Sequence, residues 1–199
     1  MKKYFSSVLG VITAVNLFAQ TWTPAQLAKA NTAKNITYLS KVEKEAIMYI
    51  NLARLFPSDF IRNELVVSAG MNKGFFKMKN DRGPYQTTLV ATLRKMKPVK
   101  ALLFDKKLFE TAKCFAKEQG ASGATGHSRK KCQYGGYDAE CCSYGQYTGI
   151  DVALQLLIDR GVPSLGHREI CLDPYYAKIG LSLHPHKQYG TCAVLDFMR

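Results

Sequence analysis

Acidic residues and histidines are both scarce in this chain of 199 residues. Fifteen Asp and Glu oppose 28 Lys and Arg, which gives a formal net charge of +13, and there are only four histidines. No nucleic-acid-binding motif accompanies the positive charge, so specific nucleic-acid recognition is not expected. No internal repeat is present, which argues against a repeat architecture.

Long apolar runs are absent after residue 19, so no membrane-spanning segment is expected there. The chain starts with the basic residues Lys2 and Lys3, followed by an apolar run from Val8 to Ala19. That run is too short to span a bilayer comfortably, and Ala19 supplies a small residue for cleavage. We predict a signal peptide over residues 1–19 and a secreted, periplasmic or cell-surface protein; a retained N-terminal anchor is the alternative. The remaining stretch of about 180 residues fits one domain.

The Cys-x-x-Cys spacing is also absent, although the chain has six cysteines, all between Cys114 and Cys192. A thiolate metal cluster is therefore disfavoured. An even number of cysteines in an exported chain predicts up to three disulfides. The adjacent Cys141 and Cys142 should each bond elsewhere. Cys114 could bridge to a neighbouring loop, and a bond between Cys171 and Cys192 is a hypothesis.

Helix signals precede strand signals along the chain. Ser40 and Glu43 form a capping box that starts a helix with one apolar stripe, and Pro57 should end it. Asp105 could cap a second helix ending near residue 120, and a third is expected over residues 152–159. Alternating apolar residues over 177–183, a turn and a return over 191–197 predict a hairpin. Helices followed by a terminal hairpin indicate an α+β layered domain.

Two stretches lack a clear pattern. Residues 20–40 are polar, and we predict an N-terminal arm or tether. Residues 70–100 carry eight Lys or Arg and one acid, and they contain several Gly and Pro. We interpret them as a basic insertion in a domain covering residues 41–199. The insertion could be a solvated loop or a contact surface for an anionic envelope polymer.

Two Gly-His dipeptides contain the side chains that are most informative about function. His127 and His167 each follow a glycine, and Glu140 and Asp159 lie between them in the sequence. Imidazole titrates near neutrality and is the commonest metal ligand. A fold that gathered these four side chains would form a polar, titratable cleft.

Asp159 is expected on an apolar helix face, because it follows Val152 and Leu156 at helical spacing. A buried carboxylate needs a partner in order to ionise, and a nearby imidazole would supply one. Alternatively, Asp159 lies at the helix end and points into water.

The remaining candidates are weaker. His184 and His186 lie in the predicted turn of the hairpin, where surface exposure is expected; an accidental surface metal site is the minor alternative. Ser128 is a possible nucleophile, but adjacent side chains seldom share useful geometry with a histidine. Arg168 and Glu169 are expected to brace a loop or to form an ion pair at the rim.

An ordered series of motifs resembles the CAP superfamily (cysteine-rich secretory proteins, antigen 5 and pathogenesis-related protein 1), in particular its bacterial SCP-like extracellular members. The resemblance covers about residues 41–197. Its motifs are INLARLFPSDF, LLFDKKLFETAKCFAKEQ, GHS, AECCSYG and LIDRGVPSLGHREICLDPYYAKIGLSL.

The resemblance implies a three-layer α-β-α sandwich with a cleft across one face. The family's tetrad of two histidines and two acids would fall on His127, Glu140, Asp159 and His167. The chain departs from the family at Asp159, where many relatives carry Glu, and beside Glu140, where the family has Gly and Asn.

Several functions fit these residues. His127 and His167 could bind Zn²⁺ or another divalent cation. Glu140 or Asp159 could then accept a hydrogen bond from a ligating histidine, or act as base on metal-bound water. A His/carboxylate network that only braces loops is the alternative. The leading hypothesis is a secreted CAP-domain binding or effector module, for which the resemblance also permits a lipid ligand. Its rival is a metal-assisted hydrolase of peptides or envelope polymers with Glu140 as base. A third option is a disulfide-braced surface protein that interacts through residues 20–39 and 70–100.

Overall fold

The computed structural model describes residues 22–66 and 83–199. The predicted signal peptide and residues 70–82 of the basic stretch lie outside the described residues. The elements, in chain order, are α1 (Pro24–Ala30), α2 (Lys41–Leu55), α3 (Pro57–Phe60), the π-helical η1 (Ile61–Val66), α4 (Pro84–Lys95), β1 (Leu103–Phe104), α5 (Lys106–Ser122), β2 (Ala139–Tyr144), α6 (Gly149–Ile158), α7 (Gly166–Leu172), β3 (Lys178–His186) and β4 (Gly190–Met198).

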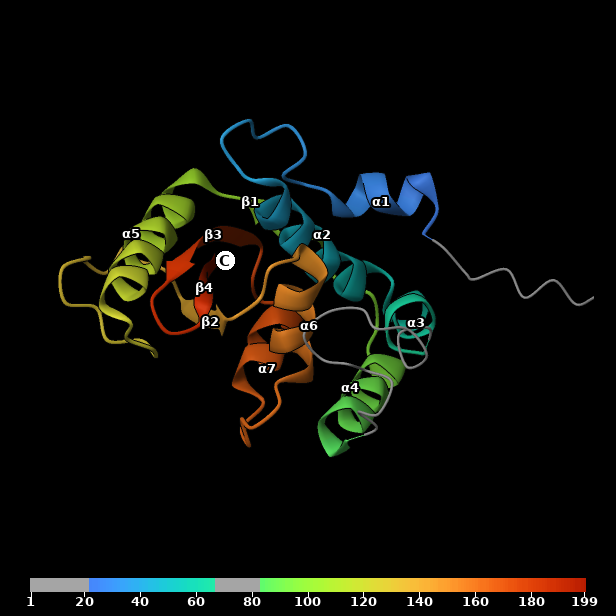
Figure 1. Ribbon diagram of the computed structural model, residues 1–199. Helices are drawn as coiled ribbons and strands as arrows, with labels where there is room; N and C mark the ends of the chain where they lie inside the picture. Colours follow the sequence, from blue (N-terminus) through green and yellow to red (C-terminus); the bar gives the residue numbers. More distant parts are fainter. Residues whose placement is uncertain (1–21, 67–82) are drawn as a thin grey trace, which may run out of the picture.

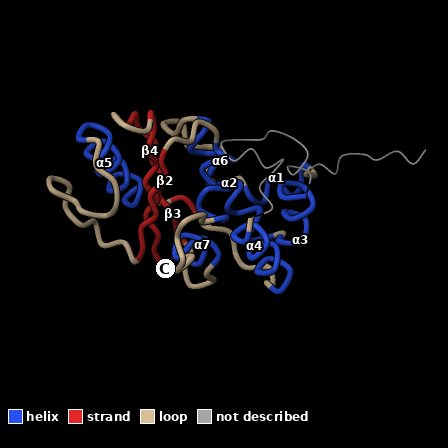
Figure 2. Tube along the Cα trace, turned by 60° about the horizontal axis from the view of Figure 1, so that its bottom comes forward, coloured by secondary structure: helices blue, strands red, loops and turns tan. Residues whose placement is uncertain are grey.

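The four strands form one mixed sheet in the order β1-β3-β4-β2. Strand β1 runs parallel to β3, whereas the β3–β4 hairpin and the β2–β4 pair are antiparallel. Helix α5 covers one face of the sheet, and α2, α6 and α7 lie on the other (Figures 1 and 2). This arrangement confirms the predicted α+β class and its three-layer α-β-α architecture.

Each face of the sheet has its own hydrophobic core. On the α5 side, the core contains Ala112, Phe115, Ala116, Cys132, Cys142, Cys192 and Val194. The larger core on the other side includes Ile47, Ile50, Cys141, Val152, Leu156, Cys171 and Leu195. Successive residues of a strand point to opposite faces. The neighbours Cys141 and Cys142 therefore belong to different cores.

Helix α5 approaches the sheet closely at Gly180 in β3. A Cβ atom added at Gly180 would lie 2.1 Å from the backbone nitrogen of Phe109. Only glycine fits this crossing without moving the helix away from the strand.

The local signals for helix starts are confirmed. Ser40 and Glu43 form the capping box of α2, and the Asp105 side chain accepts a hydrogen bond from the Leu108 backbone at the start of α5. Helix α6 begins at Gly149, earlier than predicted, because Thr148 caps it. The hairpin is also confirmed, with its strands extending further into the predicted turn.

The prediction of a tether is wrong for residues 22–39. Helix α1 has its own capping box, and Ala30, Ala33 and Leu39 are fully or almost fully buried. The Asn51 side chain of α2 donates to the Ala30 carbonyl oxygen at 3.0 Å, and the Trp22 indole donates to Glu64 at 2.7 Å. The buried residues of this segment are apolar and mostly small, whereas the segment as a whole is polar in composition. Its overall composition therefore did not indicate this packing.

The basic stretch contains a regular element that we did not predict. Helix α4 starts with Pro84 in its first turn, a position that favours proline, and it buries Leu89 and Leu93. Helix α7 and strand β2 were also not predicted. His186 is 4% exposed, so the expectation that it lies at the surface is wrong.

Arg54 of α2 ties the helix layer to the segment that follows α7. Its side chain is fully buried and donates to the backbone carbonyl oxygens of Lys100, Cys171, Asp173 and Tyr176, at 2.8–2.9 Å. Charged donors make stronger hydrogen bonds to such carbonyls than neutral donors do. None of the helices in the described ranges is long and apolar enough to cross a membrane.

Candidate functional site

The loop after α5 holds the first Gly-His dipeptide against the sheet. Gly126 has a φ of +88°, a left-handed conformation that favours glycine. Its carbonyl oxygen accepts from the Gln119 side chain at 2.5 Å, and its N–H donates to the Tyr144 hydroxyl at 2.9 Å. These two contacts, from α5 and β2, fix the position of His127.

His127 lies beside two side chains of β2. Its Nδ1 atom is 2.8 Å from the Glu140 carboxylate and 3.9 Å from the Cys142 sulfur. One ligand atom from each of the three residues lies within 4.8 Å of the other two. The His127 side chain is 55% exposed and the Glu140 side chain only 4%. The imidazole is thus reachable from solvent, while its carboxylate partner is buried.

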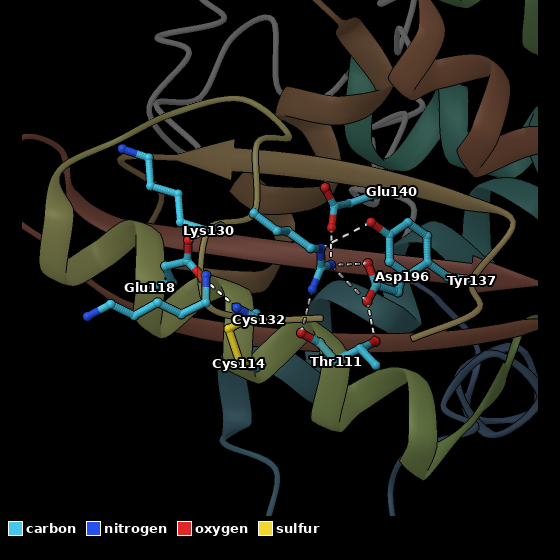
Figure 3. Close-up of a disulfide and its surroundings, with 10 residues drawn as sticks. Thr111, Cys114, Glu118, Lys130, Cys132, Tyr137, Glu140 and Asp196 are labelled. Atoms are coloured by element: carbon cyan, nitrogen blue, oxygen red, sulfur yellow. Dashed lines mark hydrogen bonds and ion pairs between the residues drawn. A yellow bond between two sulfur atoms is a disulfide. The ribbon is translucent and has the colours of Figure 1, made fainter. Parts of the chain in front are cut away.

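Arg129 binds two carboxylates, those of Glu140 and Asp196, which are labelled in Figure 3. Its guanidinium contacts Glu140 and lies 3.3 Å from Asp196 of β4. It also donates to the Thr111 carbonyl and to the Tyr137 hydroxyl, each at 3.1 Å. The Arg129 side chain is 7% exposed, so this charge is neutralised within the protein.

These contacts determine the charge of His127 and Glu140. The hydrogen bond that His127 makes to the Glu140 carboxylate raises the pKa of His127 and outweighs the effect of its partial burial. Burial alone would raise the pKa of Glu140, but the hydrogen bond with His127 and the charge of Arg129 lower it below its usual range. An ionised Glu140 with both oxygens engaged is a weak proton acceptor, which argues against its use as a general base.

Asp196 is the second carboxylate of the cluster, directly opposite Glu140 in the β2–β4 register. It is fully buried and accepts a hydrogen bond from the Thr111 hydroxyl. Burial raises the pKa of Asp196 to about 7, and the neighbouring Glu140 acts in the same direction, against Thr111 and Arg129. Two acids that share one guanidinium therefore differ strongly in acidity.

The second Gly-His dipeptide is held by Asp159. Asp159 ends α6 in a left-handed conformation and is 2% exposed, so it does not point into water. Its carboxylate lies 2.7 Å from Nδ1 of His167 and accepts the backbone N–H groups of His167 and Arg168 at 3.0 and 3.3 Å. Asp159 thus has the imidazole partner that its apolar face led us to expect.

The four predicted residues form two separate pairs. Glu140 shares its side of β2 with Cys142, which belongs to the core under α5, whereas His167 starts α7 on the opposite side. Across the described parts of the chain, no group of three ligating side chains combines the two pairs. A shared ion between His127 and His167 stays a prediction.

The other candidates have defined positions. Arg168 is 2% exposed and donates to the carbonyl oxygens of Leu157, Ile158 and Tyr85, which confirms its bracing role. Ser128 and Glu169 are exposed.

One disulfide is present among the six cysteines. Cys114 of α5 is bonded to Cys132 in the following loop, as expected for Cys114 (Figure 3). The proposed Cys171–Cys192 bond is wrong, because Cys171 lies in the core beneath α7 and Cys192 in the core beneath α5. The sheet separates the two sulfurs.

Arg129, Cys142 and Asp196 are the site residues that sequence reasoning missed. Asp196 had a signal, since it is the one charged residue within the predicted strand over 191–197. An acid in a buried strand needs a partner. Nothing local to Arg129 indicated that it would be this partner.

Among known proteins, no family model and no curated sequence matches this chain. One solved structure is similar, an extracellular protein containing a SCP domain from Bacillus anthracis. The identity is 16% and the TM-score 0.41, and the match covers 58% of this chain and 38% of that protein. The chain thus corresponds to well under half the length of that relative.

Proposed function

We propose that this protein is an extracellular CAP-like binding module that holds a divalent metal ion at His127, Glu140 and Cys142. Two observations support an extracellular role: the basic and apolar start of the chain, and the Cys114–Cys132 disulfide. The ordered motifs of the sequence support a CAP-like module. The observation that carries the metal site is the proximity of one imidazole, one carboxylate and one thiol.

The donor chemistry suits Zn²⁺ or a similar borderline-soft ion. Nitrogen, oxygen and sulfur ligands are all found on protein-bound zinc, and three protein ligands leave a position open for water or a small ligand. The pKa of the Cys142 thiol is raised, first by burial and then by the charge of Glu140, so the free thiol is protonated. A bound metal ion would displace this proton.

Hydrolysis is not part of the proposal. In the proposed site Glu140 is itself a metal ligand and its pKa is lowered, so it would not act as a base on bound water. A metal held here would serve binding, either as a structural ion or as an anchor for a ligand atom at the open position.

Zinc titration tests the site. We expect His127→Ala and Cys142→Ser each to weaken Zn²⁺ binding by roughly 10- to 100-fold, measured by calorimetry at pH 7.5. The parent protein should also release protons on binding, and its affinity should fall as the pH drops below the raised pKa of His127.

Two histidine variants complete this experiment. His184→Ala, in which a half-buried histidine outside the site is removed, should bind zinc like the parent. His167→Ala should also bind normally. If His167→Ala loses affinity as His127→Ala does, the two histidines share the ion and the thiol-containing set is wrong. Unchanged binding by His127→Ala would reject both sites.

We propose in addition that basic residues in the last turn of α4 and directly after it contact an anionic envelope polymer. Among the described residues of the basic stretch, Arg94, Lys95, Lys97 and Lys100 are all exposed. We expect Lys95→Glu/Lys97→Glu to weaken binding to immobilised dextran sulfate several-fold, and binding by the parent protein to fall with added salt. Exchanging the distant, exposed Lys187 for Glu is the control. Binding that ignores salt would contradict an electrostatic contact.

A further inference from the structure

Two unbonded cysteines lie in the same core between β2 and α7. Cys141 and Cys171 are both fully buried, and both belong to the core on the helix-rich side of the sheet. The Cys141 sulfur lies 4.0 Å from the carbonyl oxygen of His167, one helical turn before Cys171 in α7. Residues four apart in a helix lie on the same face, so Cys171 lies on the face of α7 that the Cys141 sulfur approaches at His167. The two side chains are thus neighbours in this core.

The other two unbonded cysteines lie on the opposite face. Cys142 is next to the Gly126 carbonyl oxygen at 3.5 Å, and Cys192 donates to the Ala116 carbonyl oxygen at 3.2 Å. Because neighbouring residues of β2 alternate in direction, Cys141 can reach α7 and Cys142 cannot.

We propose that Cys141 and Cys171 form a disulfide that joins strand β2 to helix α7. Sulfurs that are neighbours in one core need little movement to bond, and the Cys114–Cys132 bond indicates a compartment in which thiols are oxidised. The bond would close a loop that runs from residue 141 to residue 171, through the whole of α6.

The oxidant is a small-molecule disulfide or a disulfide-exchanging protein. One thiolate attacks a sulfur of the oxidant and displaces one thiol, and the second cysteine then displaces the other. The protein loses two protons and two electrons, and the oxidant is released as two thiols. Because both sulfurs are buried, the exchange would take place during folding, before α7 docks.

The crosslink would connect the elements that carry the two His/acid pairs. Glu140 directly precedes Cys141, and His167 precedes Cys171 by one helical turn. The disulfide would hold these pairs at a constant relative position. The inference does not depend on metal binding, since Cys142 lies on the other face of the strand.

Peptide mapping tests the bond. The full mature chain is folded with reduced and oxidised glutathione, its free thiols are alkylated, and it is digested with trypsin without reduction. Cys171 falls in the fragment 169–178, and Cys141 in the fragment 132–160. We expect these fragments to be linked, together with 114–117 through the Cys114–Cys132 bond.

Two variants resolve the ambiguity between the adjacent cysteines. Cys142→Ser should keep the link to 169–178, and Cys141→Ser should lose it. Recovery of alkylated Cys171 from the oxidised parent protein would overturn the proposal. So would a link that persists in Cys141→Ser, because Cys142 would then be the partner.

A thermal measurement gives an independent readout. Reductant should lower the Tm of the parent protein more than that of Cys141→Ala/Cys171→Ala, which keeps only the Cys114–Cys132 bond. The additional decrease should be roughly 5–15 °C. Equal decreases in the two proteins would show that no stabilising bond joins Cys141 to Cys171.

Discussion

Replacing Arg54 with methionine is expected to lower the free energy of unfolding by about 3–5 kcal/mol. Methionine fills much of the same space, but it removes the donors of four backbone carbonyl groups. A buried carbonyl oxygen without a donor has lost its hydrogen bonds to water and gains no hydrogen bond within the protein in return. Urea denaturation followed by circular dichroism would measure the loss.

The matched control is Arg94→Met. Arg94 lies in the last turn of α4 and is exposed, so its replacement should change the unfolding free energy by less than about 1 kcal/mol. Similar effects of the two substitutions would mean that Arg54 does not join α2 to the segment after α7. Arg54→Lys should recover little of the loss, because one ammonium group cannot reproduce the guanidinium fork.

Asp196→Asn is expected to change how stability depends on pH. The pKa of Asp196 is raised from 3.8 to about 7 in the folded protein, so the folded state retains a proton that the unfolded state has released. The parent protein should therefore lose about 4 kcal/mol of stability from this group as the pH rises from 4 to 7. Asparagine does not titrate, so its profile should lack this decline.

The measurement is the difference in unfolding free energy between the variant and the parent at pH 4 and at pH 8. His127 contributes in the same direction near neutrality, because its raised pKa gives stability that is lost as the pH rises. That contribution is present in both proteins. Asp138→Asn, at an exposed carboxylate, serves as control. Parallel profiles for the parent and Asp196→Asn would show that Asp196 ionises normally.

The elements that could be predicted are those whose signals are local. Ser40 with Glu43, and Asp105 with the backbone of Leu108, satisfy the free N–H groups of a helix start within three residues. The hairpin was also predictable. Apolar and polar residues alternate over 177–183, and the chain returns over 191–197, which is the pattern of strands in a sheet with buried faces. Helical spacing also led us to expect a partner for a buried Asp159, but it did not indicate which residue this partner would be.

The elements that were missed depend on partners far along the chain. Strand β2 exists through its pairing with β4, and its residues AECCSY have no strong strand pattern of their own. Helix α1 is held by contacts with α2, including the hydrogen bond from Asn51. Arg129 meets Asp196 only because the sheet brings together residues 67 apart in sequence.

The sequence by itself determined the α+β class, the main helix starts and the hairpin, because these follow from contacts and patterns within a few residues. It also named the titratable residues. Only the tertiary structure decided that His127 pairs with Glu140 and His167 with Asp159, and which sulfurs meet. The reason is the alternation of β2, which sends Glu140 and Cys142 to one core and Cys141 to the other. Which core lies against which helix depends on packing of the complete chain.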